Sequence, residues 1–181
     1  GPARGKIVIA SLPLARTMLI PRAIDHVLKN HPMLQILTRE GPYDVLEASL
    51  RSGEIDMIVG ALRTYDNEKD IITEPLFEER LAAIVRPDHP LMKAKKLALE
   101  DAIDHFWVLP PKKTPARTMF DQILKCSNNI SPDQYIETSS LATLRGLLME
   151  SDRIALVSEH QLYYELKLGM LAKLPIDLPG T

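Results

Sequence analysis

Three arginines, Arg16, Arg63 and Arg117, stand shortly after short apolar runs, where a strand is expected to give way to a loop or a helix. A guanidinium carries a rigid fork of N–H donors that matches a carboxylate or a phosphate. Hydroxyl residues and glycines occupy the same junctions, which are Ser11 to Thr17, Gly41 to Asp44, Thr114 to Arg117 and Thr138 to Ser140. For each residue alone, helix capping or a solvated surface cation is the simpler explanation. Together the junctions favour a cleft that holds a small anion or polyol.

Residue patterns typical of metal, cofactor or enzyme chemistry do not occur in the sequence. The five histidines lie far apart, and none has the helical spacing of a metal-binding pair. No phosphate-binding glycine loop, dinucleotide fingerprint or nucleophile elbow is present. Cys126, the single cysteine, is expected to be a buried and inert thiol, and Asp56 is expected to bond to backbone near Gly53. We therefore expect no catalytic residue, metal site or cofactor.

The candidate residues are positioned by alternating strands and helices in the first part of the chain. Lys6 to Ala10 and Leu34 to Thr38 predict strands, and a helix with Thr17 as its cap is expected between them. Asp44 is expected to cap a second helix, which Gly53 ends. Met57 to Val59, a short apolar run before Gly60, predicts a strand buried on both faces. The β-α-β-α-β order requires a parallel sheet whose carboxyl edge gathers the junctions.

The second part of the chain repeats this alternation after a turn-rich stretch at residues 86–90. Strands are expected at Trp107 to Leu109, at Tyr135 to Glu137 and at Ile154 to Val157, and further extended segments at Ile71 to Phe77, Leu81 to Val85 and Leu171 to Leu174. Thr114-Pro115 predicts a capped helix, Thr138 to Ser140 offer caps for the next one, and Ser158 is expected to start a helix that Gly169 closes. We predict two lobes: residues 5–86 with 157–181, and residues 87–156.

Composition places the chain among globular proteins with no basic face for nucleic acid. It has 181 residues, is 45% hydrophobic and carries a net charge of −2. No apolar run approaches the roughly 20 residues that span a bilayer, so no membrane partner is expected. The lone cysteine fits a reducing compartment. Gly1-Pro2 resembles the pair of residues left by tag removal.

The ordered set of segments resembles the effector-binding domain of LysR-type bacterial transcriptional regulators. The matching segments are IVIASLPLARTMLIPRAI, KNHPMLQILTREGPYDVLEASLRSGEIDMIVGALR, EPLFEERLAAIVRPDHPL, HFWVLPPKKTPARTMF and IETSSLATLRGLLMESDRIALVS. The resemblance implies an α/β fold of two Rossmann-like lobes joined by two crossover strands, like a type 2 periplasmic binding protein. It also implies a small-molecule effector between the lobes, and no enzyme activity.

The resemblance further implies which residues contact the effector and which partners the full-length protein has. The expected binding residues are Ser11, Leu12, Pro13, Arg16, Thr17, Gly41, Pro42, Tyr43, Gly60, Leu62, Arg63, Pro110, Thr114, Arg117, Thr138 and Ser139. The expected effector is a carboxylate or a sugar-like metabolite. Self-association as a dimer, with tetramers of the full-length protein, is expected in the cytoplasm. DNA would be contacted only through an N-terminal winged helix-turn-helix that this chain lacks.

Three alternatives to the sensor stay open at the level of sequence. An exported solute-binding protein would have a similar fold. A deaminase or dehydratase could use the same two-lobe scaffold if the cleft held a reactive group. A domain whose cleft has lost its ligand could be kept for dimerisation alone.

Overall fold

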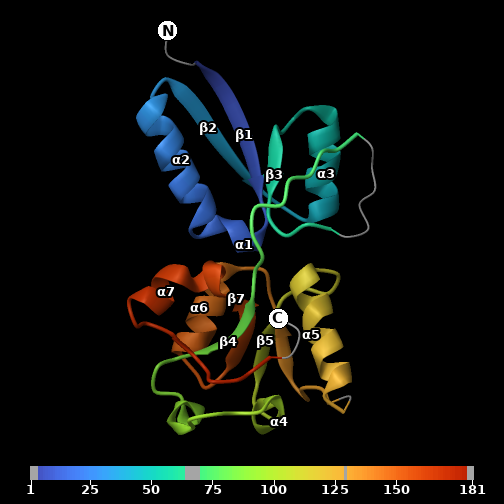
Figure 1. Ribbon diagram of the computed structural model, residues 1–181, viewed down its shortest axis with the longest axis vertical. Coiled ribbons are helices and arrows are strands. Elements are labelled where there is room, and N and C mark those ends of the chain that lie inside the picture. The colour runs from blue at the N-terminus through green and yellow to red at the C-terminus, as the bar shows by residue number, and fades with distance from the viewer. Residues whose placement is uncertain (1–3, 64–69, 129, 179–181) are drawn as a thin grey trace. The chain divides into compact units, whose positions relative to one another are not determined.

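A computed structural model describes residues 4–63, 70–128 and 130–178. The chain divides into two compact units, Gly1–Leu76 and Phe77–Thr181, and each has a sheet of its own with flanking helices (Figure 1). This mixed architecture with two sheets confirms the predicted α/β class. The Gly1-Pro2 pair lies outside the described residues.

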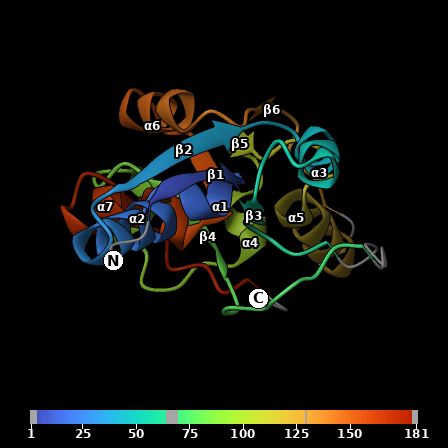
Figure 2. The same cartoon turned by 90° about the horizontal axis from the view of Figure 1, so that it is seen from above.

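Unit 1 is built on a parallel sheet with the strand order β2-β1-β3. Its elements in chain order are β1 Gly5–Ser11, α1 Pro13–Arg16, α2 Leu19–Asn30, β2 Leu34–Glu40, α3 Tyr43–Ser52 and β3 Met57–Val59. Strand β1 is central, and its alternate side chains pack in two directions. Val8 and Ala10 cluster with Leu46 of α3, whereas Ile9 clusters with Ile20 of α2. Helices therefore cover both faces of the sheet (Figures 1 and 2).

The expectation that β3 is buried on both faces is wrong. Met57 is 43% exposed, and Ile58 and Val59 are only half-buried. The reason is that β3 pairs only with β1 among the described residues and so forms one edge of the three-stranded sheet. Gly53, by contrast, ends α3 with a positive φ of 81°, which confirms the predicted left-handed cap.

Helix starts in unit 1 differ from the predicted caps. The short helix α1 occupies the expected loop, Thr17 ends it, and α2 begins after Met18 without a side-chain cap. Pro42 takes the cap position of α3, which leaves Asp44 within the first turn, where a carboxylate favours the helix dipole. Asp56 does not bond near Gly53. Its Oδ2 accepts a hydrogen bond of 2.8 Å from the backbone N–H of Val8.

Unit 2 has a mixed five-stranded sheet with the order β6-β5-β7-β4-β8. Its elements are β4 Leu81–Val85, the 3₁₀ helix η1 Pro90–Lys93, α4 Leu99–Ala102, β5 Trp107–Leu109, α5 Pro115–Cys126, β6 Tyr135–Glu137, α6 Leu141–Met149, β7 Ile154–Ser158, the 3₁₀ helix η2 Glu159–Leu162, α7 Tyr163–Lys167 and β8 Ala172–Lys173. Strand β5 is parallel to its neighbours β6 and β7, whereas β4 is antiparallel to β7 and β8. A single helix was predicted between Ser158 and Gly169. The structure has η2 there, followed by the five-residue helix α7.

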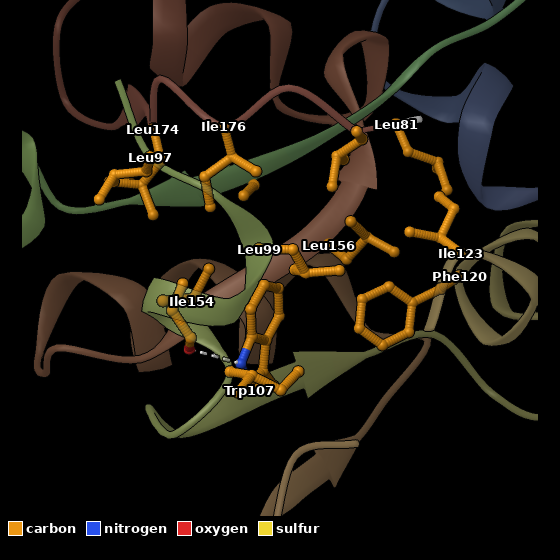
Figure 3. Packing of buried hydrophobic residues seen from close by; sticks show 14 of the residues in the cluster. Leu81, Leu97, Leu99, Trp107, Phe120, Ile123, Ile154, Leu156, Leu174 and Ile176 are labelled. Carbon is orange, nitrogen blue, oxygen red and sulfur yellow. Dashed lines mark hydrogen bonds between the residues drawn. The ribbon is translucent and has the colours of Figure 1, made fainter. Parts of the chain in front are cut away.

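The largest apolar cluster of unit 2 gathers around Trp107. Its indole and the ring of Phe120 lie with centroids 5.5 Å apart, and Ile154 and Leu156 pack beside them (Figure 3). The buried indole Nε1–H donates to the backbone oxygen of Ala102 at 3.1 Å (Figure 3). A second cluster on the other face includes residues of α6 and η2. Burial of this amount of apolar side chain is the main stabilising contribution to the unit.

His89 is a buried polar residue of unit 2, only 1% exposed. Its Nδ1 accepts from the N–H of Leu91 at 3.0 Å, so the ring proton belongs to Nε2, which donates to the backbone oxygen of Asp152 at 2.8 Å. Burial lowers the pKa of His89, although the hydrogen bond to Asp152 and the charge of that residue partly oppose the shift. The imidazole is therefore held neutral. Cys126, expected to be buried, is exposed at the end of α5.

The boundaries of the two units differ from the predicted lobes. We expected residues 77–86 and 157–181 to belong with the first lobe, but Ala82 pairs with Val157 and Val85 with Ala172 inside the sheet of unit 2. Residues of these segments also share both apolar clusters of that unit. The boundary is set by pairing between strands that lie more than 70 residues apart in the sequence. Local sequence patterns do not show such pairing. No strand is present in the described part of the predicted extended segment at 71–77.

Candidate functional site

In unit 1 the carboxyl ends of three parallel strands meet at one edge of the sheet. Ser11 of β1 lies opposite Glu40 of β2 and opposite Val59 of β3. The backbone N–H of Leu12 continues the pairing with the oxygen of Val59 at 2.9 Å. The candidate residues of unit 1 are Ser11 at the end of β1 and residues of the segments that follow the three strands. Open α/β sheets bind ligands at this edge.

The loop after β1 is held closed by Arg16. Its Nη2 and Nε donate to the backbone oxygen of Ser11 at 2.8 and 3.2 Å, and Nε also lies 3.3 Å from the Ser11 hydroxyl. A carboxylate oxygen of Glu40 lies 3.5 Å from Arg16 Nε. Burial lowers the pKa of Arg16, and Glu40 partly opposes this. Pro13 and Thr17 bound the short helix that contains Arg16. The guanidinium therefore joins the ends of β1 and β2.

Gly60 follows β3 at a point of close backbone approach. A Cβ atom built there would lie 2.4 Å from the Cβ of Leu12 and 2.7 Å from its Cδ1. Only glycine fits this contact without movement of the chain. Gly41 at the end of β2 is less constrained, since its nearest neighbour would be a Leu46 methyl carbon at 3.5 Å.

Arg63 lies over the ring of Tyr43, with 4.6 Å between its guanidinium carbon and the ring centroid. Tyr43 begins α3 immediately after Pro42, so the turn after β2 and the turn after β3 meet here. Nε and Nη1 of Arg63 are buried and have no hydrogen-bond partner among the described residues. Leu62 beside it is 49% exposed. Of the candidate residues in unit 1, Arg63 has the chemistry that best suits an anion.

Unit 2 brings a second group of candidate residues to the carboxyl ends of β5 and β6. Leu109 lies opposite Glu137, and the N–H of Thr138 bonds to the oxygen of Leu109 at 3.1 Å. Thr114 caps α5 as predicted, because its Oγ1 accepts from the N–H of Arg117 at 3.3 Å. The same hydroxyl donates to the backbone oxygen of Pro111 at 2.7 Å.

Arg117 is 6% exposed and has several partners within unit 2. Its Nε donates to Asp121 at 3.2 Å, and its Nη1 lies 3.2 Å from the oxygen of Pro110 and 3.3 Å from Glu137. The guanidinium carbon also lies 5.0 Å from the ring centroid of Tyr135. Despite burial, which acts to lower it, the pKa of Arg117 is raised, by hydrogen bonds to Tyr135 and Asp121. Arg117 thus ties the first turn of α5 to the ends of β5 and β6.

The hydroxyls after β6 serve the start of α6. Thr138 Oγ1 accepts from the N–H of Ser140 at 3.1 Å, and Ser140 Oγ caps the helix by accepting from Thr143 at 3.2 Å. Ser139 between them is exposed.

Sequence reasoning missed the carboxylates that pair with two of the arginines. Glu40 and Glu137 are each the last residue of a strand, and Asp121 follows Arg117 by four residues. The i,i+4 spacing is a recognisable signal for the Arg117–Asp121 pair. The other two pairs, Arg16–Glu40 and Arg117–Glu137, each join a helix to the last residue of a strand and have no local signal.

Within the described residues, no group of three or more His, Cys, Asp and Glu side chains could hold a metal ion. The same part of the chain contains no helix that is both long and apolar enough for a membrane span.

Comparison with known proteins gives a consistent family match. The model of the LysR substrate binding domain matches residues 1–180. The HTH-type transcriptional regulator GalR of Pseudomonas putida is 39% identical over 181 residues, which are 100% of this chain and 45% of that protein. This chain thus spans about half the length of the curated relatives it matches.

Solved structures of similar fold include two effector-binding domains with bound small molecules. The BenM domain with its effector benzoate has a TM-score of 0.70 and 26% identity, and the match covers 98% of this chain and 80% of that one. The QuiR domain in complex with shikimate has a TM-score of 0.76 and 19% identity, with 99% and 84% covered. The second likeness concerns the fold alone. Both agree with the predicted two-lobe, periplasmic-binding-protein-like fold of type 2.

Proposed function

Because this chain belongs to the LysR substrate-binding domain family, we propose that it is the effector-sensing part of a transcriptional regulator. A small metabolite binds it and changes how the full-length protein acts on DNA. Such a ligand can act only through different affinities for two arrangements of the protein.

The observation that carries the proposal is the guanidinium of Arg63. Two of its nitrogen atoms, Nε and Nη1, are buried without a hydrogen-bond partner among the described residues, and Arg63 follows the end of β3 in the parallel sheet. An unpaired buried donor costs about 1–3 kcal/mol, and more when the group is charged. A ligand carboxylate that accepts hydrogen bonds from Arg63 removes this cost, and the free energy recovered favours binding.

The proposed effector-binding residues are those expected from the sequence, with different roles. In unit 1, Arg63 offers N–H groups to the ligand, and Tyr43 supports Arg63 through its ring. In unit 2, Thr138 and Ser139 are the candidates that carry hydroxyl groups after β6. Arg16 and Arg117 position loops through their internal partners. The glycines and prolines, with Ser11, Leu12, Thr17, Leu62 and Thr114, shape the two sheet edges.

The partners and the compartment of the full-length protein are part of the proposal. It associates as a dimer, assembles as a tetramer, contacts DNA through a winged helix-turn-helix domain and works in the cytoplasm. Its effector domain has no catalytic role, in agreement with relatives that are named as regulators. The exported solute-binding protein considered above is not favoured by these relatives.

A thermal-shift panel tests the sensing function. Benzoate, 4-hydroxybenzoate, shikimate, quinate, muconate and simple sugars are added to the protein one at a time. A ligand at a hundred times its dissociation constant adds about 2.7 kcal/mol of stability. For a chain of this length the midpoint rises by roughly 5–10 °C. No rise with any compound, repeated by calorimetry, would count against a sensor for these classes of metabolite.

A further inference from the structure

The three candidate arginines are not equivalent, although the sequence places all of them at strand ends. Arg16 bonds to Ser11 and pairs with Glu40. Arg117 bonds to Pro110 and pairs with Asp121 and Glu137. In both cases a carboxylate of the same unit already balances the positive charge. Withdrawing either guanidinium would also break its hydrogen bonds to backbone oxygens of the same unit, so neither arginine is available to a ligand without cost.

Arg63 lacks such a partner among the described residues. No ion pair is found for it there, and its Nε and Nη1 are buried without an acceptor. In the described part of the chain, its guanidinium instead contacts the ring of Tyr43, whose centroid lies 4.6 Å from the guanidinium carbon. An aromatic face attracts a guanidinium, but it does not replace the hydrogen-bond acceptors that the guanidinium N–H groups need. Within the described residues, no carboxylate therefore balances the positive charge of Arg63.

We infer that the effector is a monocarboxylate whose single negative charge is received by Arg63, and this inference rests on the proposed function. A second carboxylate would meet no unpaired arginine among the described candidate residues and would be desolvated without compensation. A neutral ligand would leave the charge of Arg63 unmatched. Because Nε and Nη1 are buried, the side chain or the atoms that cover it have to move when the carboxylate enters.

Acetate, acetamide and malonate are the probes that separate these ligand charges. Acetamide matches the shape of acetate without its charge, and malonate adds a second charge. Each is titrated into the protein at constant ionic strength, and the Nε–H signal of Arg63 is followed by NMR. That signal is identified by its loss in Arg63→Lys. We expect a saturable shift with acetate, with a dissociation constant of roughly 1 mM for so few atoms.

Arg63→Gln and Arg39→Gln form a matched pair of variants for the same titrations, followed by the midpoint of thermal unfolding. Arg39 is an exposed arginine of the same unit, and its Nη1 donates to the backbone oxygen of Thr38 at 3.0 Å. Loss of a charge-assisted pair should weaken acetate binding by about 10- to 100-fold in Arg63→Gln. Arg39→Gln should bind acetate as the wild type does.

Three results would overturn the inference. Acetate that causes no saturable shift up to 100-fold above the expected constant of about 1 mM would show that no carboxylate site exists at Arg63. Acetamide binding as tightly as acetate would show that charge is not recognised. Malonate binding more than about tenfold tighter than acetate would show a site for a dianion.

The panel of metabolites described above tests the proposed sensing function separately from the role of Arg63. A panel compound that stabilises the wild type and Arg63→Gln equally would leave the sensor standing and refute the role of Arg63. A monocarboxylate that stabilises only the wild type and Arg39→Gln supports both.

Discussion

Replacement of Gly60 by alanine should destabilise unit 1 even though the backbone there has no left-handed conformation. The added Cβ would lie 2.4 Å from Leu12 Cβ, 2.7 Å from Cδ1 and 2.8 Å from Cγ. The closest of these atoms is fixed by the backbone, so a change of rotamer cannot remove the contact. Leu12 is also buried, and its N–H is bonded to Val59. Overpacking of this kind costs about 1–3 kcal/mol, and we expect the upper part of that range.

Hydrogen exchange of the Leu12 amide measures this effect where it arises. The bond to the oxygen of Val59 protects the amide in the wild type, and Gly60→Ala should raise its exchange rate by about tenfold for each 1.4 kcal/mol of stability that is lost. Gly146→Ala is the control, because a Cβ at that helical position meets no atom within 4 Å. It should stabilise α6 by about 0.5–1 kcal/mol through the reduced chain entropy of the unfolded state.

Second substitutions at Leu12 distinguish a backbone clash from a side-chain clash. In the Gly60→Ala background, Leu12→Ala leaves the Cβ that is 2.4 Å away, so it should not restore the bond to Val59. Leu12→Gly removes that atom and should show a favourable coupling energy of about 0.5–3 kcal/mol in a double-mutant cycle. A Gly60→Ala protein within about 0.5 kcal/mol of the wild type would refute the reasoning, because surface substitutions without strain fall in that range.

Three further predictions concern unit 2. Burial lowers the pKa of His89. As the pH falls below about 6.5, this imidazole therefore takes up a proton in the unfolded chain before it does so in the folded one. Urea unfolding should therefore show stability that falls from pH 7.5 to pH 5.5, and His89→Asn should flatten this dependence; a wild-type profile as flat as the variant's would contradict it. Trp107→Phe should cost about 1–3 kcal/mol or more, because Ala102 loses its buried donor, and chemical denaturation followed by circular dichroism tests this. Thr114→Ala should lower the stability by about 1 kcal/mol, because the N–H of Arg117 loses its acceptor at the start of α5. Thr114→Ser, measured in the same way, should retain most of this stability because the hydroxyl remains.

The sequence alone determined the features that depend on neighbouring residues. Apolar runs located β1, β5 and β7, and Thr114-Pro115 located the start of α5. Gly53 located the end of α3, because few other residues accept a positive φ. The order of these signals, with the family resemblance, was enough to predict the α/β class and the regulator family. Each of these inferences uses interactions within a few residues along the chain, which a sequence pattern records directly.

The tertiary structure alone decided which candidate residues are available for chemistry. Arg16, Arg63 and Arg117 have equivalent places in the sequence pattern, yet carboxylates at the ends of other elements neutralise two of them. Nothing in the sequence around Arg63 shows that its partner is the ring of Tyr43, twenty residues earlier. Strand pairing likewise decided that β3 is an edge and that residues 157–178 pack with unit 2. The physical reason is common to all of these: charge balance and strand neighbours are set by contacts between distant segments, and such contacts leave no period or spacing in the sequence.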